Sequence, residues 1–193
     1  MRSITALILS AAAFLAGSIM YSKKIYCRQD FSYGLPLGTR IYFLFRRHRF
    51  RRPRGIARFP DGGQVRTVSD EVALFSYARE SDTLTRLGVL SARPEPGTNI
   101  RNAKLKMDRG VLYIAYKCNN RVRKPDAMQC RLLFDLETGD LRKLEDPAEV
   151  LRVRELFADY WPLHRDQLTP ISTLKKIVLS RLEAADRDRS GAE

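Results

Sequence analysis

Thr39–Arg54 reads TRIYFLFRRHRFRRPR and changes character at its midpoint. Its first half, Thr39–Arg46, is dense in aromatic and β-branched residues, which favour the pleated, half-buried surface of a β-strand. Its second half, Arg46–Arg54, interleaves arginines with His48 and Phe50. The stretch therefore predicts a core strand that is followed directly by a concentration of positive charge.

Strand-like segments continue from this stretch to residue 145. They alternate with turn sequences such as Pro60-Asp61-Gly62-Gly63 and Glu137-Thr138-Gly139-Asp140, in which glycine accepts positive φ angles. Short strands at this spacing predict an antiparallel meander over residues 39–145, folded as a sandwich or a curled sheet. The further strands are expected at residues 55–59, 64–68, 71–77, 83–90, 99–107, 111–118, 128–136 and 141–144.

Residues 146–185 predict a pair of helices. Asp146-Pro147-Ala148-Glu149 is a start signal, with Asp146 as N-cap, proline at the first position and Glu149 placed to complete a capping box. The second helix begins after Thr169-Pro170 and carries apolar residues at helical spacing. We expect the helices to pack on the sheet or on each other, and residues 186–193 to form a disordered tail. The expected fold class is α+β, mainly β.

Residues 1–22 carry a targeting signal. The 17 residues from Ile4 to Met20 contain no charge, and as a helix they would rise about 25 Å, slightly less than the roughly 30 Å hydrocarbon core of a bilayer. They match either a secretory signal peptide, cleaved near Ala16-Gly17-Ser18, or an uncleaved membrane anchor that ends at Lys23-Lys24. We expect residues 23–38 to form a linker to the β domain.

The three cysteines allow one disulfide prediction. A hairpin of strands 111–118 and 128–136, centred on Lys124, pairs the apolar faces of both strands and sets Cys118 opposite Cys130. Directly opposed residues have Cα atoms about 4.5–5.5 Å apart, which is within disulfide range. The alternative is a pair of buried, reduced thiols, and Cys27 is left over.

Charge and cysteines point to different compartments. Lys23, Lys24, Arg28 and Arg40 follow the apolar run, so the positive-inside rule leaves the body of an anchored chain in the cytoplasm. A disulfide instead implies an oxidising compartment. We favour a cell-envelope location with the body exported or facing outward, and keep a cytoplasm-facing anchored protein as the alternative.

The net charge of +13 is concentrated in two segments. Residues 40–66 hold nine arginines and one acidic residue, and residues 101–131 hold nine basic and two acidic residues. Such clusters attract anionic surfaces, although arginines can also protect a sheet edge from pairing. The residues expected to bind an anionic surface are Arg46, Arg47, Arg49, Arg51, Arg52, Arg54, Arg121, Arg123 and Lys124.

Signatures of catalysis are absent from the sequence. It contains no Gly-rich phosphate loop, G-x-S-x-G, H-E-x-x-H or C-x-x-C motif, and its two histidines, His48 and His164, are far apart. We expect no cofactor, no metal and no catalytic residues.

The sequence predicts an envelope-associated, non-catalytic binding domain whose partner is a protein or an anionic surface. The alternatives are a membrane-tethered, cytoplasm-facing lipid or nucleic-acid binder that uses residues 46–54, and a small hydrolase with a dispersed site; specific nucleic-acid recognition is disfavoured because no known binding motif is present.

Overall fold

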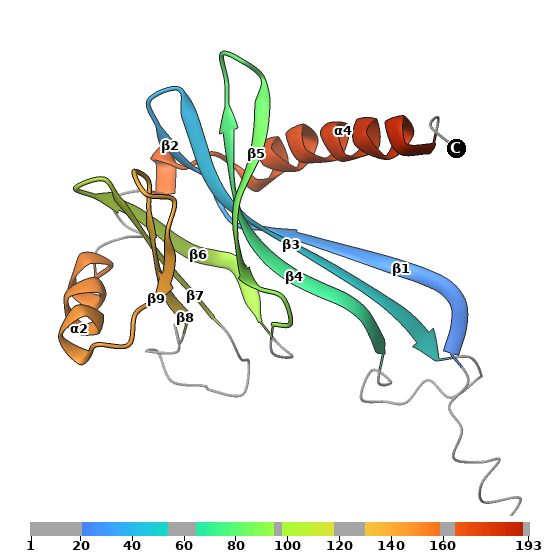
Figure 1. Ribbon diagram of the computed structural model, residues 1–193, viewed down its shortest axis with the longest axis horizontal. Coiled ribbons are helices and arrows are strands. Elements are labelled where there is room, and N and C mark those ends of the chain that lie inside the picture. Colours follow the sequence, from blue (N-terminus) through green and yellow to red (C-terminus); the bar gives the residue numbers. More distant parts are fainter. Residues whose placement is uncertain (1–20, 54–64, 95–97, 118–129, 159–164, 191–193) are drawn as a thin grey trace, which may run out of the picture. The chain divides into compact units, whose positions relative to one another are not determined.

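A computed structural model describes residues 21–53, 65–94, 98–117, 130–158 and 165–190. The protein is mainly β, with antiparallel sheets and two helices at its C-terminal end, which confirms this part of the expected fold class (Figure 1). The apolar run 4–20 and the strand expected at residues 55–59 lie outside the described residues.

The strands form two sheets. The first has the order β1-β3-β4-β5, with β2 also paired to β3, and the second has the order β6-β7-β8-β9. The pairs β2–β3, β4–β5, β6–β7, β7–β8 and β8–β9 are antiparallel. The bounds are β1 Tyr21–Phe31, β2 Leu35–Leu37, β3 Arg40–Pro53, β4 Arg66–Ala78, β5 Thr83–Ser91, β6 Asn99–Asp108, β7 Val111–Lys117, β8 Cys130–Asp135 and β9 Leu141–Lys143.

Contacts divide the chain into two compact units. The described residues of unit 1 are 21–28, 48–53 and 65–69, and those of unit 2 are 29–47 and the described residues from Asp70 onward. The strands β1, β3 and β4 contribute residues to both units.

Within unit 2, the two sheets share one hydrophobic core. Leu44 of β3 and Leu74 of β4 belong to the same buried cluster as Ile100, Leu112 and Ile114 of the second sheet. All five side chains are inaccessible to solvent. The apolar residues that alternate along these strands therefore meet face to face, as in a sandwich.

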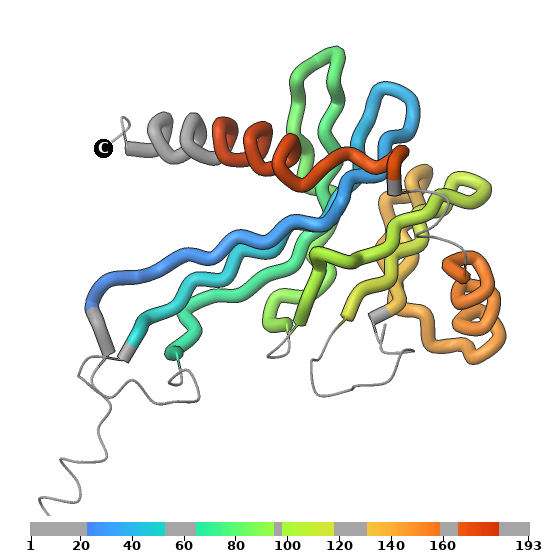
Figure 2. The backbone as a smooth tube through the Cα atoms, turned by 180° about the vertical axis from the view of Figure 1, so that it is seen from behind, coloured from blue at the N-terminus to red at the C-terminus, as the bar shows by residue number. Residues whose placement is uncertain are grey.

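The outer face of each sheet is covered by a different helix (Figures 1 and 2). Phe43 and Phe45 of β3 pack with Leu174 and Val178 of α4, which spans Ile171–Ser190. On the second sheet, Tyr113, Ala115 and Leu133 pack with Val153 and Phe157, at the end of α2 (Pro147–Leu156). Each helix packs on its own sheet, and α4 continues past Ala185, where the sequence analysis ended it. A short 3-10 helix, η1, covers Arg165–Gln167.

Side-chain hydrogen bonds stabilise both ends of helix α2. The Asp146 side chain accepts a hydrogen bond from Ala148 N at 3.0 Å, which confirms the predicted N-cap. The predicted capping box is wrong, because both oxygens of Glu149 accept hydrogen bonds from Arg142. At the other end, Lys104 and Lys106 of β6 donate to the Phe157 and Leu156 carbonyls, where the helix dipole favours positive charge.

Two bulges adapt β5 to the core. Its pairing with β4 passes from Ser91 to Val89 and from Gly88 to Arg86, so Leu90 and Leu87 are the extra residues. Both leucines pack against the inter-sheet core although they are three residues apart. Bulges also disrupt the pairing potential of an edge strand, and β5 ends the strand order of its sheet.

The predicted register of the β7–β8 hairpin is wrong by two residues. Tyr116 lies opposite Cys130, and Ile114 lies opposite Leu132, where the prediction paired Cys118 with Cys130. A shift of two residues keeps every side chain on its face, so the apolar pattern fits both registers equally well. Cys130 is therefore paired with Tyr116, and Cys118 itself lies outside the described residues.

Residues 23–38 differ from the linker that the sequence led us to expect. They contain most of β1 and all of β2. Between these strands, Gly34 exchanges two backbone hydrogen bonds with Thr169, at 3.0 and 2.8 Å. A side chain at Gly34 would place its Cβ 2.6 Å from Ile41 Cγ2. The bridge therefore requires glycine at this position, where the segment that leads into α4 meets the first sheet.

Replacing Gly34 with alanine should lower the free energy of unfolding by about 1–3 kcal/mol, because the added methyl overpacks this contact. Gly88→Ala is the matched control, since its Cβ would lie 3.6 Å from the Leu141 side chain, at ordinary contact distance. Chemical denaturation of both variants measures the difference. Equal stability of the two variants would contradict the close packing around Gly34.

Candidate basic interaction surface

The structure divides the arginine-rich segment between two environments. Arg46 and Arg47 belong to unit 2, whereas Arg49, Arg51 and Arg52 belong to unit 1. The other candidate residues, Arg54, Arg121, Arg123 and Lys124, lie outside the described residues. The segment also differs from an edge strand, because β3 lies between β1 and β4 in the strand order. Protection of a free strand edge therefore does not explain its arginines.

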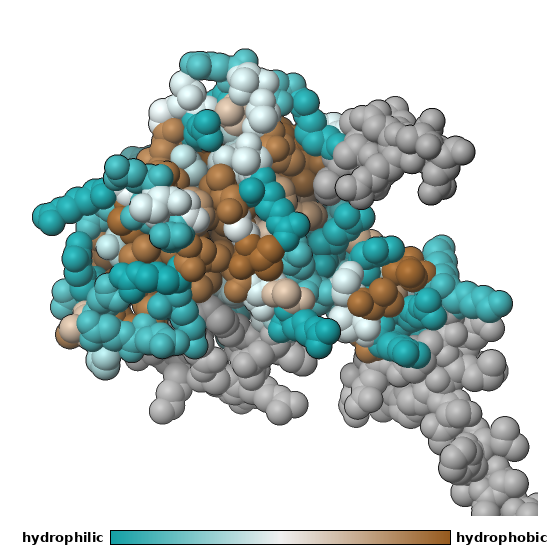
Figure 3. All heavy atoms as spheres, in the orientation of Figure 1, coloured by the Kyte–Doolittle hydropathy of each residue, from teal (hydrophilic) through white to brown (hydrophobic). Residues whose placement is uncertain are grey.

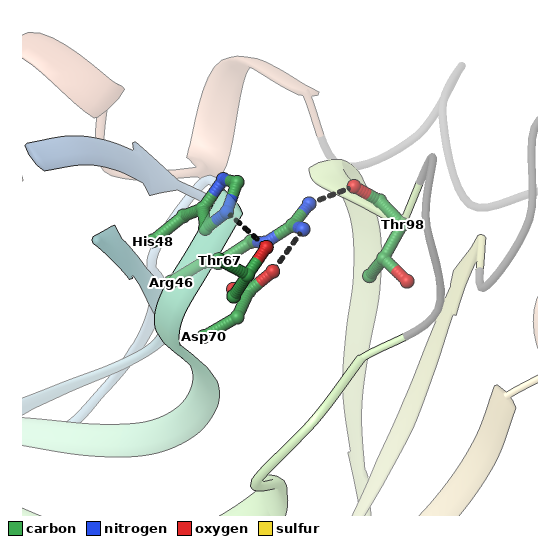
Figure 4. Close-up of polar contacts among 5 residues, drawn as sticks. All are labelled: Arg46, His48, Thr67, Asp70 and Thr98. Carbon is green, nitrogen blue, oxygen red and sulfur yellow. Dashed lines mark hydrogen bonds and ion pairs between the residues drawn. The ribbon is translucent and has the colours of Figure 1, made fainter. Parts of the chain in front are cut away.

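Arg46 is buried in an ion pair and does not join the surface charges. Its Nε donates to Asp70 Oδ1 at 2.9 Å and its Nη2 donates to Asp70 Oδ2 at 2.6 Å. Its Nη1 donates to the carbonyl oxygen of Thr98, just before β6 (Figure 4). Only 11% of the Arg46 side chain and 9% of the Asp70 side chain are exposed. The expectation that Arg46 is an exposed anion-binding cation is corrected, because its side chain is buried and Nε, Nη1 and Nη2 each donate inside unit 2.

Tyr116 shares this electrostatic environment. Burial raises the pKa of the Tyr116 phenol to about 12, and the positive charge of Arg46 acts in the opposite direction. Arg47, the next residue, is half-buried, and its Nε has no hydrogen-bond partner among the described residues. Neither Arg46 nor Arg47 is a well-exposed cation.

The described part of unit 1 is rich in basic residues. Its described residues, 21–28, 48–53 and 65–69, include seven lysines and arginines and no Asp or Glu. We call this part of unit 1 the basic ribbon, because it is built from β1, β3 and β4. Its cations are Lys23, Lys24, Arg28, Arg49, Arg51, Arg52 and Arg66.

One face of the basic ribbon is aromatic. The Tyr26 and Phe50 rings are stacked with centroids 5.9 Å apart, and the His48 ring lies 5.0 Å from Phe50. His48 Nε2 is 3.2 Å from the Thr67 hydroxyl. The Arg52 guanidinium lies 4.5 Å from the centre of the Tyr26 ring, and Lys24 Nζ lies 5.4 Å from it. The side chains of this aromatic face are therefore engaged with one another.

The opposite face mixes exposed cations with apolar side chains. Because side chains alternate along a strand, the neighbours of Tyr26, Phe50 and Thr67 point the other way. This face, which we call the Ile25–Val68 face, includes two exposed apolar residues, Ile25 at 37% and Val68 at 45%. Figure 3 shows hydrophobic side chains among hydrophilic ones on the surface of this unit. The cations of the Ile25–Val68 face are Lys23, Arg49, Arg51 and Arg66.

The sequence did not single out several residues of the basic ribbon as binding residues. Lys23 and Lys24 served only as a topology signal, Arg66 entered only the charge count of residues 40–66, and Ile25 and Val68 carried no signal of their own. The pairing of β1 with β3 joins residues 21–28 to residues 48–53, which are 20 or more positions away in the sequence. No local pattern encodes that pairing, although the strand-forming residues before Arg28 were a usable hint.

Comparisons with known protein families, curated proteins and solved structures find no match to this chain. Among the described residues, no group of His, Cys, Asp or Glu side chains is arranged to hold a metal ion. The described helices also include none with the length and apolar character needed to cross a membrane.

Removing one partner of the Arg46–Asp70 pair should cost about 3–5 kcal/mol of unfolding free energy, because the other charge stays buried and unpaired. Arg46→Met and Asp70→Leu are the single variants. The double variant should recover most of the loss, since no charge remains to be solvated. Chemical denaturation measures all three, and a double variant as unstable as the sum of the singles would contradict the pairing.

The raised pKa of Tyr116 predicts alkaline instability. Because the folded-state pKa is about 12 and the unfolded value is about 10, this contribution to stability is complete below pH 10 and is lost between pH 10 and 12. The loss should be about 2–3 kcal/mol, and Tyr116→Phe should remove it. Denaturation across this pH range, compared between wild type and variant, is the measurement. Identical pH dependence would show that Tyr116 titrates normally.

Proposed function

We propose that this protein is a non-catalytic, membrane-associated binding domain whose basic ribbon binds the anionic surface of a lipid bilayer. The observation that supports this most strongly is the composition of the ribbon, whose described residues hold seven cations and no acidic residue. A juxtamembrane lysine or arginine contributes about 1 kcal/mol to attraction by an anionic leaflet.

The position of the ribbon in the sequence supports the same partner. Strand β1 begins at Tyr21, directly after the uncharged run 4–20. If that run is anchored in the bilayer, Lys23 lies at most roughly 10 Å of extended chain beyond its end. The ribbon would then face the headgroups at a high effective concentration.

We propose the side of the membrane on which the body of the protein lies from the charges that follow the apolar run. The oxidising compartment favoured in the sequence analysis depended on the Cys118–Cys130 register, which the observed strand pairing does not support. The excess of lysine and arginine after the apolar run remains, and it favours a body that stays on the cytoplasmic side.

Single-stranded nucleic acid is the main rival partner for a surface of arginines and aromatics. Base stacking requires a free ring face, but Tyr26 is stacked on Phe50 and lies beneath Arg52. The ring contacts therefore favour lipid headgroups, which need the cations and not the rings.

The proposal is tested by partition of the full chain into vesicles of neutral phosphatidylcholine and into vesicles that also contain phosphatidylglycerol. The uncharged run 4–20 contributes similarly in both, so the ratio of the two partition coefficients reports the ribbon. Lys23→Gln/Arg49→Gln/Arg66→Gln should lower this ratio roughly a hundredfold at low salt. High salt should weaken the wild-type preference, because exposed charges are screened.

The matched control is Arg79→Gln/Lys175→Gln/Lys176→Gln, which removes three exposed cations from unit 2. It should leave the ratio nearly unchanged. Equal effects of the two triple variants would show that net charge alone drives binding. Tighter binding to single-stranded DNA than to anionic vesicles, lost in the ribbon variant, would instead assign the ribbon to nucleic acid.

A further inference from the structure

We infer that the basic ribbon contacts the bilayer through its Ile25–Val68 face, with these two apolar side chains inserted at the level of the headgroups. This inference rests on the proposed function and assigns the lipid contact to one of the two faces of the ribbon. The other face, which carries Tyr26 and Phe50, is inferred to point away from the lipid and to stiffen the strands.

The cations of the two faces differ in what they contact. Lys24 and Arg52 lie over the Tyr26 ring, so binding a phosphate would compete with these contacts. On the Ile25–Val68 face, Lys23, Arg49 and Arg66 are exposed, and their side chains make no hydrogen bond, ion pair or ring contact with another described residue. Arg51 is half-buried, and because its Nε is itself buried, this nitrogen is not a donor that a phosphate can reach. The exposed ammonium group of Lys23 and guanidinium groups of Arg49 and Arg66 can donate hydrogen bonds to phosphate oxygens.

The apolar side chains of this face are placed for insertion. Ile25 on β1 and Val68 on β4 lie on the two strands that flank β3, the strand that carries Arg49 and Arg51. Apolar side chains bordered by cations are the composition with which peripheral segments bind the interface, since apolar area enters the headgroup region while cations meet anionic lipid. Of the six large apolar residues described as exposed, three belong to unit 1: Ile25, Val65 and Val68.

Removing the same charge from each face tests the assignment. Lys23→Gln/Arg49→Gln takes two cations from the Ile25–Val68 face, and Lys24→Gln/Arg52→Gln takes two from the aromatic face. With the full chain and the two vesicle compositions described above, the first variant should lower the partition ratio roughly thirtyfold. The second should lower it much less.

The possible results separate this inference from the function on which it rests. No effect of either pair on the ratio overturns the proposed function, and the inference with it. Equal effects, or a larger effect of Lys24→Gln/Arg52→Gln, leave the lipid-binding function in place and overturn the assignment of the face.

Insertion is tested without changing the charge. Ile25→Gln/Val68→Gln should weaken partition into both kinds of vesicle roughly tenfold, because apolar area no longer leaves water. The control Val89→Gln/Leu151→Gln alters two exposed apolar residues of unit 2 and should leave partition unchanged. Equal losses in the two variants would contradict insertion.

A substitution that strengthens binding tests the inference even if the variants that weaken binding fold poorly. Tryptophan favours the membrane interface, so Val68→Trp should strengthen partition several-fold, whereas Thr67→Trp, on the aromatic face, should not. Far-UV circular dichroism confirms that each variant keeps its strands. Stronger partition of Thr67→Trp than of Val68→Trp would overturn the inference.

Discussion

The burial of β3 on both of its faces is the constraint on which the rest of unit 2 depends. From Ile41 to Phe45 every side chain is buried, with Tyr42 and Leu44 turned to the second sheet and the other three turned to α4. A strand with two apolar faces needs a cover on each side. The second sheet supplies one cover and α4 the other, and Gly34 with Thr169 ties the segment before α4 to the strands that it covers.

Arg46, which follows these buried residues, is stabilised in the interior by its ion pair with Asp70. Arg46 enters the interior because Asp70 takes two of its donors and the Thr98 carbonyl takes a third. A buried charge is tolerated when its hydrogen-bonding groups are satisfied in this way. The described part of the basic ribbon differs, since it contains no acidic residue, and its cations Lys23, Arg49 and Arg66 have exposed side chains. Arg46 is thus a buried ion-pair partner in unit 2, whereas Arg49 is an exposed cation in unit 1.

The sequence predicted the periodic features of the structure and missed those that depend on long-range pairing. Strand composition and turn residues located most of the strands, and the Asp146 signal located the start of α2. The β7–β8 register failed because a period of two determines which face a side chain occupies and leaves shifts of two residues open. Strand β1 was missed because it follows an apolar run that dominates the local pattern. For the candidate site, the arginine run was visible in the sequence. The sequence did not show that Arg46 is buried, because its burial depends on an ion pair with Asp70, which lies 24 residues away.

The central claim is that the basic ribbon binds an anionic bilayer. Hydrogen exchange of the full chain, reconstituted in nanodiscs of neutral lipid and of anionic lipid, tests it most directly. The account predicts slower amide exchange in residues 21–28, 48–53 and 65–69 on the anionic lipid, reversed by high salt, with the amides of unit 2 unchanged. Ribbon exchange that is the same on both lipids, or protection that appears only in unit 2, would contradict it.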